Sequence, residues 1–437
     1  MKRITNLFLT AGLFVAAAGF VFTSCTKEGP QGTAGTNGKN GVDANETCKQ
    51  CHAPSMVDRV AVEFQMSKHS YGVAEFEEAG NGACTSCHSE KGFIYVCQNN
   101  VPATFSLVNG KYVNNYTPDA ANQFGAIGCW TCHSSLHTTY GIADLAFTTT
   151  SPVSMTMYAG LKEINIPSDS GVGNLCAKCH QPRPVTCGYD PAGRVLNYDS
   201  LVSHPDVVAY DSALGNGNHG VKPSYRLGVH YGTVGAIFAG VGGIELAPPG
   251  GVSYSNSKHT TVAACPDCHM ASPMTGIAGG HSFSVRNSKE TPLTSSTTFN
   301  FNGCNADSTC HAKEPITATS TYWATKRAGV KLLLDQLADK INGLGMGHNI
   351  LHADATSANL WAGITTGNWD GYLDFYDASA NPTGYWKLTS TPKFPTLTNA
   401  QLGAIINFQL CLREYSLGIH NNSYTTALLT NSIKSLP

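Results

Sequence analysis

The feature that most constrains this chain is a short motif, Cys-x-x-Cys-His, which occurs five times between residues 48 and 269. Random placement of the 16 cysteines and 16 histidines among 437 residues would give about 0.02 copies. The repetition therefore indicates one chemical task carried out at five places. We number the copies from the amino terminus as the first to fifth sites: Cys48/Cys51/His52, Cys84/Cys87/His88, Cys129/Cys132/His133, Cys176/Cys179/His180 and Cys265/Cys268/His269.

The spacing of this motif is typical of covalent haem attachment. Two cysteines at i and i+3 of a helical turn lie on one face, where their thiols can add to the two vinyl groups of a porphyrin. The histidine that follows can then reach the iron as its proximal ligand. A zinc site would need four ligands gathered from two such pairs, and neither zinc nor a disulfide explains why a histidine follows every pair. The sequence therefore predicts haem c at all five sites.

A less regular sixth site follows in series. Cys304 and Cys310 enclose five residues instead of two, and His311 follows the second cysteine. Haem attachment through an expanded loop is the favoured interpretation, and a disulfide or two unrelated thiols is the alternative. Three further cysteines, Cys97, Cys187 and Cys411, remain, and in an exported protein two of them could form a disulfide. The sequence does not say which two.

Ten histidines remain after the six proximal ones, and a low-spin electron-transfer haem needs a second axial ligand. His137 lies one helical turn after His133, so it cannot reach the far side of the same iron and should serve a neighbouring haem. His230 is chosen over His204, His219, His348 and His352 as the sixth candidate. The predicted distal ligands are His69, His137, His230, His259, His281 and His420.

The amino terminus has the form of an export signal. Lys2 and Arg3 precede an apolar stretch over 7–22, and the small residues before Cys25 are typical of a bacterial lipobox, in which the cysteine is lipidated. The alternatives are a plain cleaved signal and an uncleaved anchor. Residues 1–24 are thus predicted to be a signal peptide, and 25–43 a collagen-like G-x-y tether. That tether could alternatively be a trimerising stub.

Composition and periodicity predict a mainly α fold with extensive irregular loops. Charged residues make up 13% of the chain and the net charge is −2, which argues against nucleic-acid binding. We expect a haem-binding region over 44–312, rich in Gly, Ser and Thr and too loose to build a core without porphyrins. A helical carboxyl-terminal region over 313–437 should pack on the haems. Its helices are expected at 330–343, at 402–410 with Thr398 as cap, and at 424–433.

The chain resembles multihaem c-type cytochromes of the tetrahaem cytochrome c and pentahaem nitrite reductase superfamily. The resemblance rests on His259, the segment from Cys265 to Met270, and Gly280-His281. The tail from Tyr415 to Asn421 is similar to the carboxyl-terminal part of ammonia-forming nitrite reductases, which implies a distal haem ligand at His420. The resemblance to the superfamily implies a multihaem fold organised around stacked haems. No site here ends in the lysine of the catalytic haem in that family, so nitrite reduction is not carried over.

These observations predict an exported hexahaem electron carrier more than an enzyme. It would be a lipid-anchored periplasmic or cell-surface lipoprotein, with the outer membrane as the favoured place. Its partners would be a quinol oxidase module or other cytochromes. One alternative is a multihaem reductase of nitrite, hydroxylamine or a sulfur oxyanion, with one open haem. Another is a homo-oligomeric cytochrome filament.

Overall fold

The computed structural model describes residues 54–71, 84–101, 105–108, 111–114, 125–158, 160–183, 198–209, 229–274, 277–287, 297–306, 310–344, 351–353, 369–373 and 397–437. The predicted signal peptide and the tether that begins at Cys25 lie outside these residues. So does the whole first site, Cys48, Cys51 and His52. Cys187, His219, His348 and the side chain of His352 are also outside them. The described residues all belong to one compact unit, 50–437.

The described part is mainly helical, as predicted, and its strands are short. The helices are α3 (Pro54–Gln65), α5 (Thr85–His88), α6 (Glu90–Gln98), α7 (Cys129–Cys132), α8 (Val172–Ala177), α9 (Tyr198–Ser203), α10 (Val234–Ala239), α11 (His259–Val262), α12 (Cys265–His269), α13 (Ala324–Gly343), α14 (Asn399–Arg413) and α15 (Asn422–Lys434). The described 3-10 turns are η2 (Ile142–Leu145), η3 (Thr156–Tyr158), η4 (Asp169–Gly171) and η5 (Gly280–Ser282). Antiparallel pairing joins β1 (Phe105–Val108) to β2 (Lys111–Asn114), β3 (Val153–Ser154) to β4 (Glu163–Ile164) and β5 (Leu351–Ala353) to β6 (Trp369–Leu373). None of the described helices is long and apolar enough to cross a membrane.

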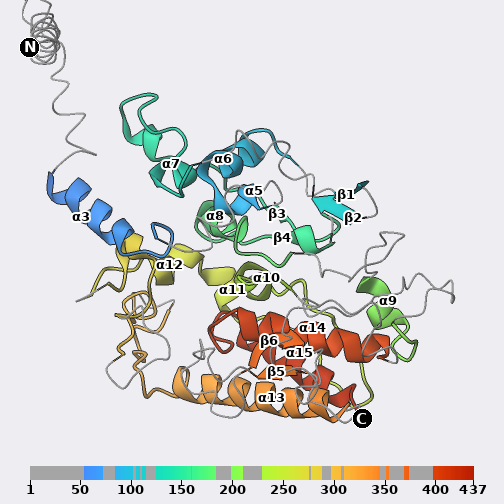
Figure 1. Cartoon of the computed structure of the whole chain (residues 1–437). Coiled ribbons are helices and arrows are strands. Elements are labelled where there is room, and N and C mark those ends of the chain that lie inside the picture. Colours follow the sequence, from blue (N-terminus) through green and yellow to red (C-terminus); the bar gives the residue numbers. More distant parts are fainter. Residues whose placement is uncertain are drawn as a thin grey trace, which may run out of the picture. The chain divides into compact units, whose positions relative to one another are not determined.

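The three carboxyl-terminal helices form where the hydrophobic periodicity predicted them. On α13, Val330, Leu334 and Ile341 are buried, whereas Leu332 on the opposite face is 57% exposed. Thr398 caps α14 as expected: its hydroxyl accepts the Gln401 N–H, and the Gln401 side chain accepts the Thr398 N–H. Helices α13, α14 and α15 pack on one another (orange and red in Figure 1).

The hydrophobic core is shared between the two regions that the sequence separates near residue 312. It joins Val153, Ile164 and Ile237 to the apolar faces of α13, α14 and α15. The expectation that the Gly-rich region would lack a core was therefore incomplete: it contributes its β3–β4 hairpin and α10 to a core that the carboxyl-terminal helices complete. Burial of this apolar area stabilises the unit by about 25 cal/mol per Å².

Asn407 connects the two parts inside the core. It is fully buried on α14, and its side chain accepts the Ile244 N–H at 2.8 Å and donates to the Ile244 carbonyl at 2.7 Å. It also donates to Ser432 on α15 at 3.0 Å. One amide thus satisfies the backbone of a loop that has no other regular structure around it.

Replacing Asn407 by Leu should destabilise the protein by about 1–3 kcal/mol, because the buried Ile244 N–H would lose its partner, whereas the Ile244 carbonyl would keep the Leu246 N–H. The measurement is urea unfolding of the purified holoprotein. Leu332→Asn on the exposed face of α13 is the control and should change stability by less than about 0.5 kcal/mol. Equal midpoints for Asn407→Leu and the wild type would contradict this role.

Candidate haem-binding sites

The second to fifth sites each lie on a short helical turn, as covalent attachment requires. Cys84 precedes α5, Cys129 begins α7, and Cys265 begins α12. In three of the sites the turn closes with a hydrogen bond from the histidine N–H to the carbonyl of the first cysteine. The lengths are 3.0 Å at His88, 2.9 Å at His133 and 2.9 Å at His180. Both cysteines and the histidine therefore stand along one turn.

The first site is known only from its sequence motif. Cys48, Cys51 and His52 precede the first described residue, Pro54, at the start of α3. Their predicted roles, two thioether links and a proximal iron ligand, therefore stay predictions.

The sixth site closes the same bond as the second, third and fourth despite its longer loop. The N–H of His311 donates to the carbonyl of Cys304 at 2.9 Å. The Asn305 side chain fixes the exit of the loop by accepting the Ile316 N–H at 2.7 Å and donating to the Ile316 carbonyl at 3.1 Å. The first cysteine and the histidine are thus placed as in the shorter motifs.

Four of the described proximal histidines face a second histidine from a distant segment. Each partner is one of the predicted distal ligands. The distances between ring centroids are 6.0 Å for His180 and His69, 6.2 Å for His88 and His230, 6.2 Å for His311 and His259, and 6.2 Å for His269 and His420.

This spacing matches the one that a single iron between two imidazoles would require. A metal–imidazole bond of about 2 Å, plus about 1.1 Å from the nitrogen to the ring centre on each side, gives about 6 Å. Ordinary edge contacts between rings cover the same range, so one pair alone would say little. The informative observation is that four different motifs each meet a different, distant histidine at this distance.

Hydrogen bonds at Nδ1 orient several of these rings. The Nδ1 atoms of His269, His259 and His133 lie 2.9, 3.1 and 2.8 Å from the backbone carbonyls of Phe283, Ile419 and Leu145 respectively. A carbonyl can only accept, so Nδ1 carries the proton and Nε2 keeps its lone pair. This is the tautomer and orientation that a metal-bound histidine needs.

Burial keeps the central histidines neutral. The pKa of His180 is lowered to about 4, first by burial and then by the charges of neighbouring histidines, His69 foremost. Burial likewise lowers the pKa of His69 and of His269. Neutral imidazole is the form that binds iron.

The cysteines of different sites also meet. The thiols of Cys87 and Cys179, of Cys176 and Cys265, and of Cys268 and Cys304 shift one another's pKa, which places the two members of each pair beside each other. These links connect the second, fourth, fifth and sixth sites in that order. Cys132 of the third site interacts electrostatically with Cys176 and Cys179, which places the third site beside the fourth.

Two of the predicted distal ligands, His281 and His137, are not among the four histidine pairs. His281 interacts with His133, although the main influence lowering its pKa is burial, and Glu63 acts in the opposite direction. The Glu63 carboxylate on α3 accepts the His281 N–H at 2.9 Å, which holds η5 against that helix. His137 contacts the rings of Trp130 and Tyr140 at 5.9 and 6.0 Å. That His137 binds the iron of a neighbouring haem stays a prediction.

The two described surplus cysteines do not pair with each other. Cys411 is buried in the main core, whereas Cys97 packs beside Val96 in a separate cluster. Both are reduced thiols in this structure, and burial raises the pKa of Cys97 to about 11.

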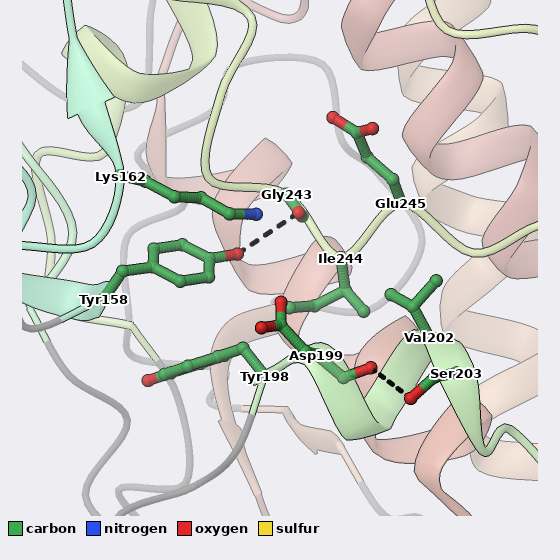
Figure 2. A pocket seen from close by; sticks show the side chains of 9 residues that line it. All are labelled: Tyr158, Lys162, Tyr198, Asp199, Val202, Ser203, Gly243, Ile244 and Glu245. Atoms are coloured by element: carbon green, nitrogen blue, oxygen red, sulfur yellow. Dashed lines mark hydrogen bonds between the residues drawn. The ribbon is translucent and has the colours of Figure 1, made fainter.

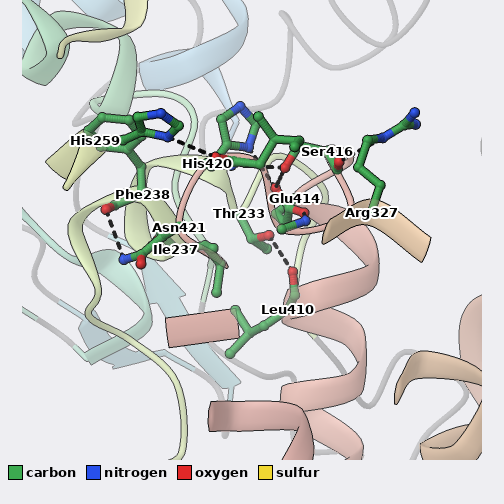
Figure 3. Close-up of polar contacts among 12 residues, drawn as sticks. Thr233, Ile237, Phe238, His259, Arg327, Leu410, Glu414, Ser416, His420 and Asn421 are labelled. Atoms are coloured by element: carbon green, nitrogen blue, oxygen red, sulfur yellow. Dashed lines mark hydrogen bonds and ion pairs between the residues drawn. The ribbon is translucent and has the colours of Figure 1, made fainter. Parts of the chain in front are cut away.

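Sequence reasoning missed the residues that hold the distal histidines. The guanidinium of Arg413, at the end of α14, donates to the Val229 carbonyl and lies 4.5 Å from the ring centre of Tyr231. These neighbours flank His230, so Arg413 positions it from 183 residues further along the chain. Glu414 does the same for His420 (Figure 3). Glu414 lies only six residues from His420, so the sequence could have indicated that the two side chains meet. Nothing in the sequence links Arg413 to His230.

A cleft of about 300 Å³ lies elsewhere in the described part. It is lined by Tyr158, Lys162, Tyr198, Asp199, Val202, Ser203, Gly243, Ile244 and Glu245, as Figure 2 shows. Tyr158 donates to the Gly243 carbonyl at 3.3 Å, and the Lys162 ammonium lies 4.2 Å from the centre of its ring. None of these nine residues is a cysteine or histidine. The cleft is therefore separate from the cysteine and histidine pairs.

Comparison with known proteins adds no relative: no family model, curated protein or solved structure matches this chain. Within the described ranges, no group of three or more His, Cys, Asp or Glu side chains converges as a metal site. Haem needs only two protein ligands, because the porphyrin supplies four nitrogens.

Replacing His420 by Ala should open one iron without removing its haem. We expect a high-spin signal from about one-sixth of the iron in the oxidised protein, and carbon monoxide binding after reduction, because the distal ligand is lost. The matched control is His204→Ala, which removes a described histidine outside the four pairs. Low-spin iron throughout His420→Ala, with all haems present, would contradict the assignment.

Proposed function

We propose that this protein is an exported hexahaem cytochrome that carries electrons along a chain of haems, each held by two histidines. The observation that carries the proposal is the recurrence of histidine pairs 6.0–6.2 Å apart at four different cysteine motifs. Haem iron supplies a reversible one-electron change. The paired cysteines would hold each haem covalently, and two histidines would bind its iron.

The contacts between cysteines suggest the order of the haems. Thioether cysteines stand at the porphyrin edge, so adjacent cysteines imply adjacent haem edges. The links favour a path through the second, fourth, fifth and sixth haems, with the third beside the fourth. We expect the stacked haems of the predicted fold along this path, with His69 and His180 near its centre.

The amino-terminal sequence supports the proposed location. An export signal, Cys25 at a lipobox and the Gly-rich segment to residue 43 favour a lipoprotein tethered outside the inner membrane. A tethered carrier would exchange electrons with a quinol oxidase module or with other cytochromes.

The alternative function is reduction of nitrite, hydroxylamine or a sulfur oxyanion at one open haem. A specific observation makes the third site the place to look. The ring of His133 stacks on Phe147 with centroids 5.3 Å apart, and the loop that carries this site exposes Trp130, Tyr140 and Ile142. The histidine pairs at the second, fourth, fifth and sixth sites favour the carrier.

The test that separates the two functions uses the reduced, fully loaded protein. On addition of nitrite or hydroxylamine we expect at most slow, stoichiometric reoxidation and no new absorption band, because no iron offers an open position. Absorbance is followed by stopped flow with excess electron donor. Sustained turnover would overturn the carrier and support the reductase.

The irregular sixth site has its own test. Replacing both Cys304 and Cys310 by Ala should lower the mass of the intact protein by one haem, because their thioethers would be its only covalent links. Cys97→Ala, which removes a surplus cysteine, should retain all six. An unchanged haem number in the double variant would show that this pair holds no haem.

A further inference from the structure

A buried carboxylate stands directly behind one of the proposed iron ligands. Glu414 follows α14 and is only 1% exposed, and its Oε2 lies 2.6 Å from Nδ1 of His420. The same carboxylate accepts the Ser416 hydroxyl at 2.7 Å and the Gly418 N–H at 2.8 Å. Figure 3 shows Glu414 and Ser416 gathered below the His420 ring.

Three hydrogen-bond donors surround this buried carboxylate: the His420 ring, the Ser416 hydroxyl and the Gly418 N–H. Such a set of donors favours the charged form of a carboxyl group. Arg327 is a nearby positive group, with its Nε donating to the Ser416 carbonyl at 3.3 Å and its guanidinium 4.9 Å from the centre of the Trp323 ring.

The other oriented histidines have weaker partners at Nδ1. His259, His269 and His133 meet neutral backbone carbonyls. Among the described residues one other carboxylate approaches a histidine, since Glu63 lies 3.8 Å from Nδ1 of His281. A charged acceptor at 2.6 Å draws the Nδ1 proton of His420 far more strongly than a carbonyl does.

We propose that Glu414 gives His420 partial imidazolate character and thereby makes the fifth haem, attached at Cys265 and Cys268, the one with the lowest reduction potential. This inference rests on the proposed function. A more basic ligand and a buried negative charge both stabilise Fe³⁺ relative to Fe²⁺. Glu414 acts through His420 and is a positioning residue.

The consequence is that the reduction potential would vary along the chain of haems. The fifth haem lies between the fourth and the sixth in the order that the cysteines suggest. Electrons would rest on its neighbours and cross it in an uphill step. Glu414 would thus divide the chain of haems into two pools.

The ring planes provide a way to observe this haem separately. His269 and His420 are nearly parallel, at 17°, whereas the other three pairs cross at 60°, 64° and 83°. Parallel axial imidazoles give a rhombic low-spin EPR signal, and strongly crossed ones give a highly anisotropic signal. Among the four described pairs only this one predicts a rhombic signal, and the rhombic signal that is lost in His420→Ala is therefore the one assigned to the fifth haem.

The experiment is a reductive titration of the holoprotein followed by low-temperature EPR, with haem counted by mass. In the wild type the rhombic signal should be the last to disappear. In Glu414→Gln it should disappear earlier, with at least a tenfold change in the Fe³⁺/Fe²⁺ equilibrium, which is about 59 mV for one electron. Glu245→Gln makes the same change at a carboxylate in the cleft, apart from the histidine pairs, and it should leave the order unchanged.

The possible outcomes distinguish a failure of this inference from a failure of the proposed function. A protein with no haem at Cys265 and Cys268, or with that iron high-spin, would contradict the proposed ligation itself. A rhombic signal that is present but not last in the wild type would overturn the role of Glu414 alone. So would an equal shift in Glu414→Gln and Glu245→Gln, because the carboxylate beside His420 would then have no effect of its own.

Discussion

The proposed arrangement depends on one constraint: each proximal histidine would have to meet a second histidine from far along the chain, as four of the described ones do. The position of the proximal histidine is local, since the motif sets it within one helical turn. The distal histidine has to be held in place by tertiary packing. Three distal histidines are held from one short segment at the end of α14. Arg413 positions His230, the Ile419 carbonyl orients His259, and Glu414 orients His420.

This explains why the carboxyl-terminal helices matter to sites that lie hundreds of residues away. Helix α14 is buried on nearly every side, and groups near its carboxyl-terminal end and at the start of α15 bind the segments that carry His230 and His259. Thr233 donates to the Leu410 carbonyl at 2.8 Å, just beyond His230. Asn421 bonds to the loop at Asn256, shortly before His259. The core formed by α13–α15 therefore acts as a rigid frame for the ligands.

The sequence predicted the local structure well and the long-range organisation poorly. The second to fifth motifs lie on the short helical turns that their spacing predicts, because such a turn is decided within five residues, and haem attachment at them stays a prediction. The pattern of Val330, Leu334 and Ile341 revealed α13, because helical periodicity is local. Which histidine meets which motif could not be predicted, since His88 and His230 are joined only through the fold. The shared core was missed for the same reason: its Gly-rich half has no periodicity until α14 packs on it.

Six haems with two histidines each are the central claim, and the spin state of the oxidised, fully loaded protein tests it most directly. Low-temperature EPR, with optical spectra for the haem count, should show only low-spin iron, part of it rhombic and part highly anisotropic. High-spin iron amounting to about one-sixth of the total or more would contradict the claim. It would show that at least one proximal histidine has no partner across its iron.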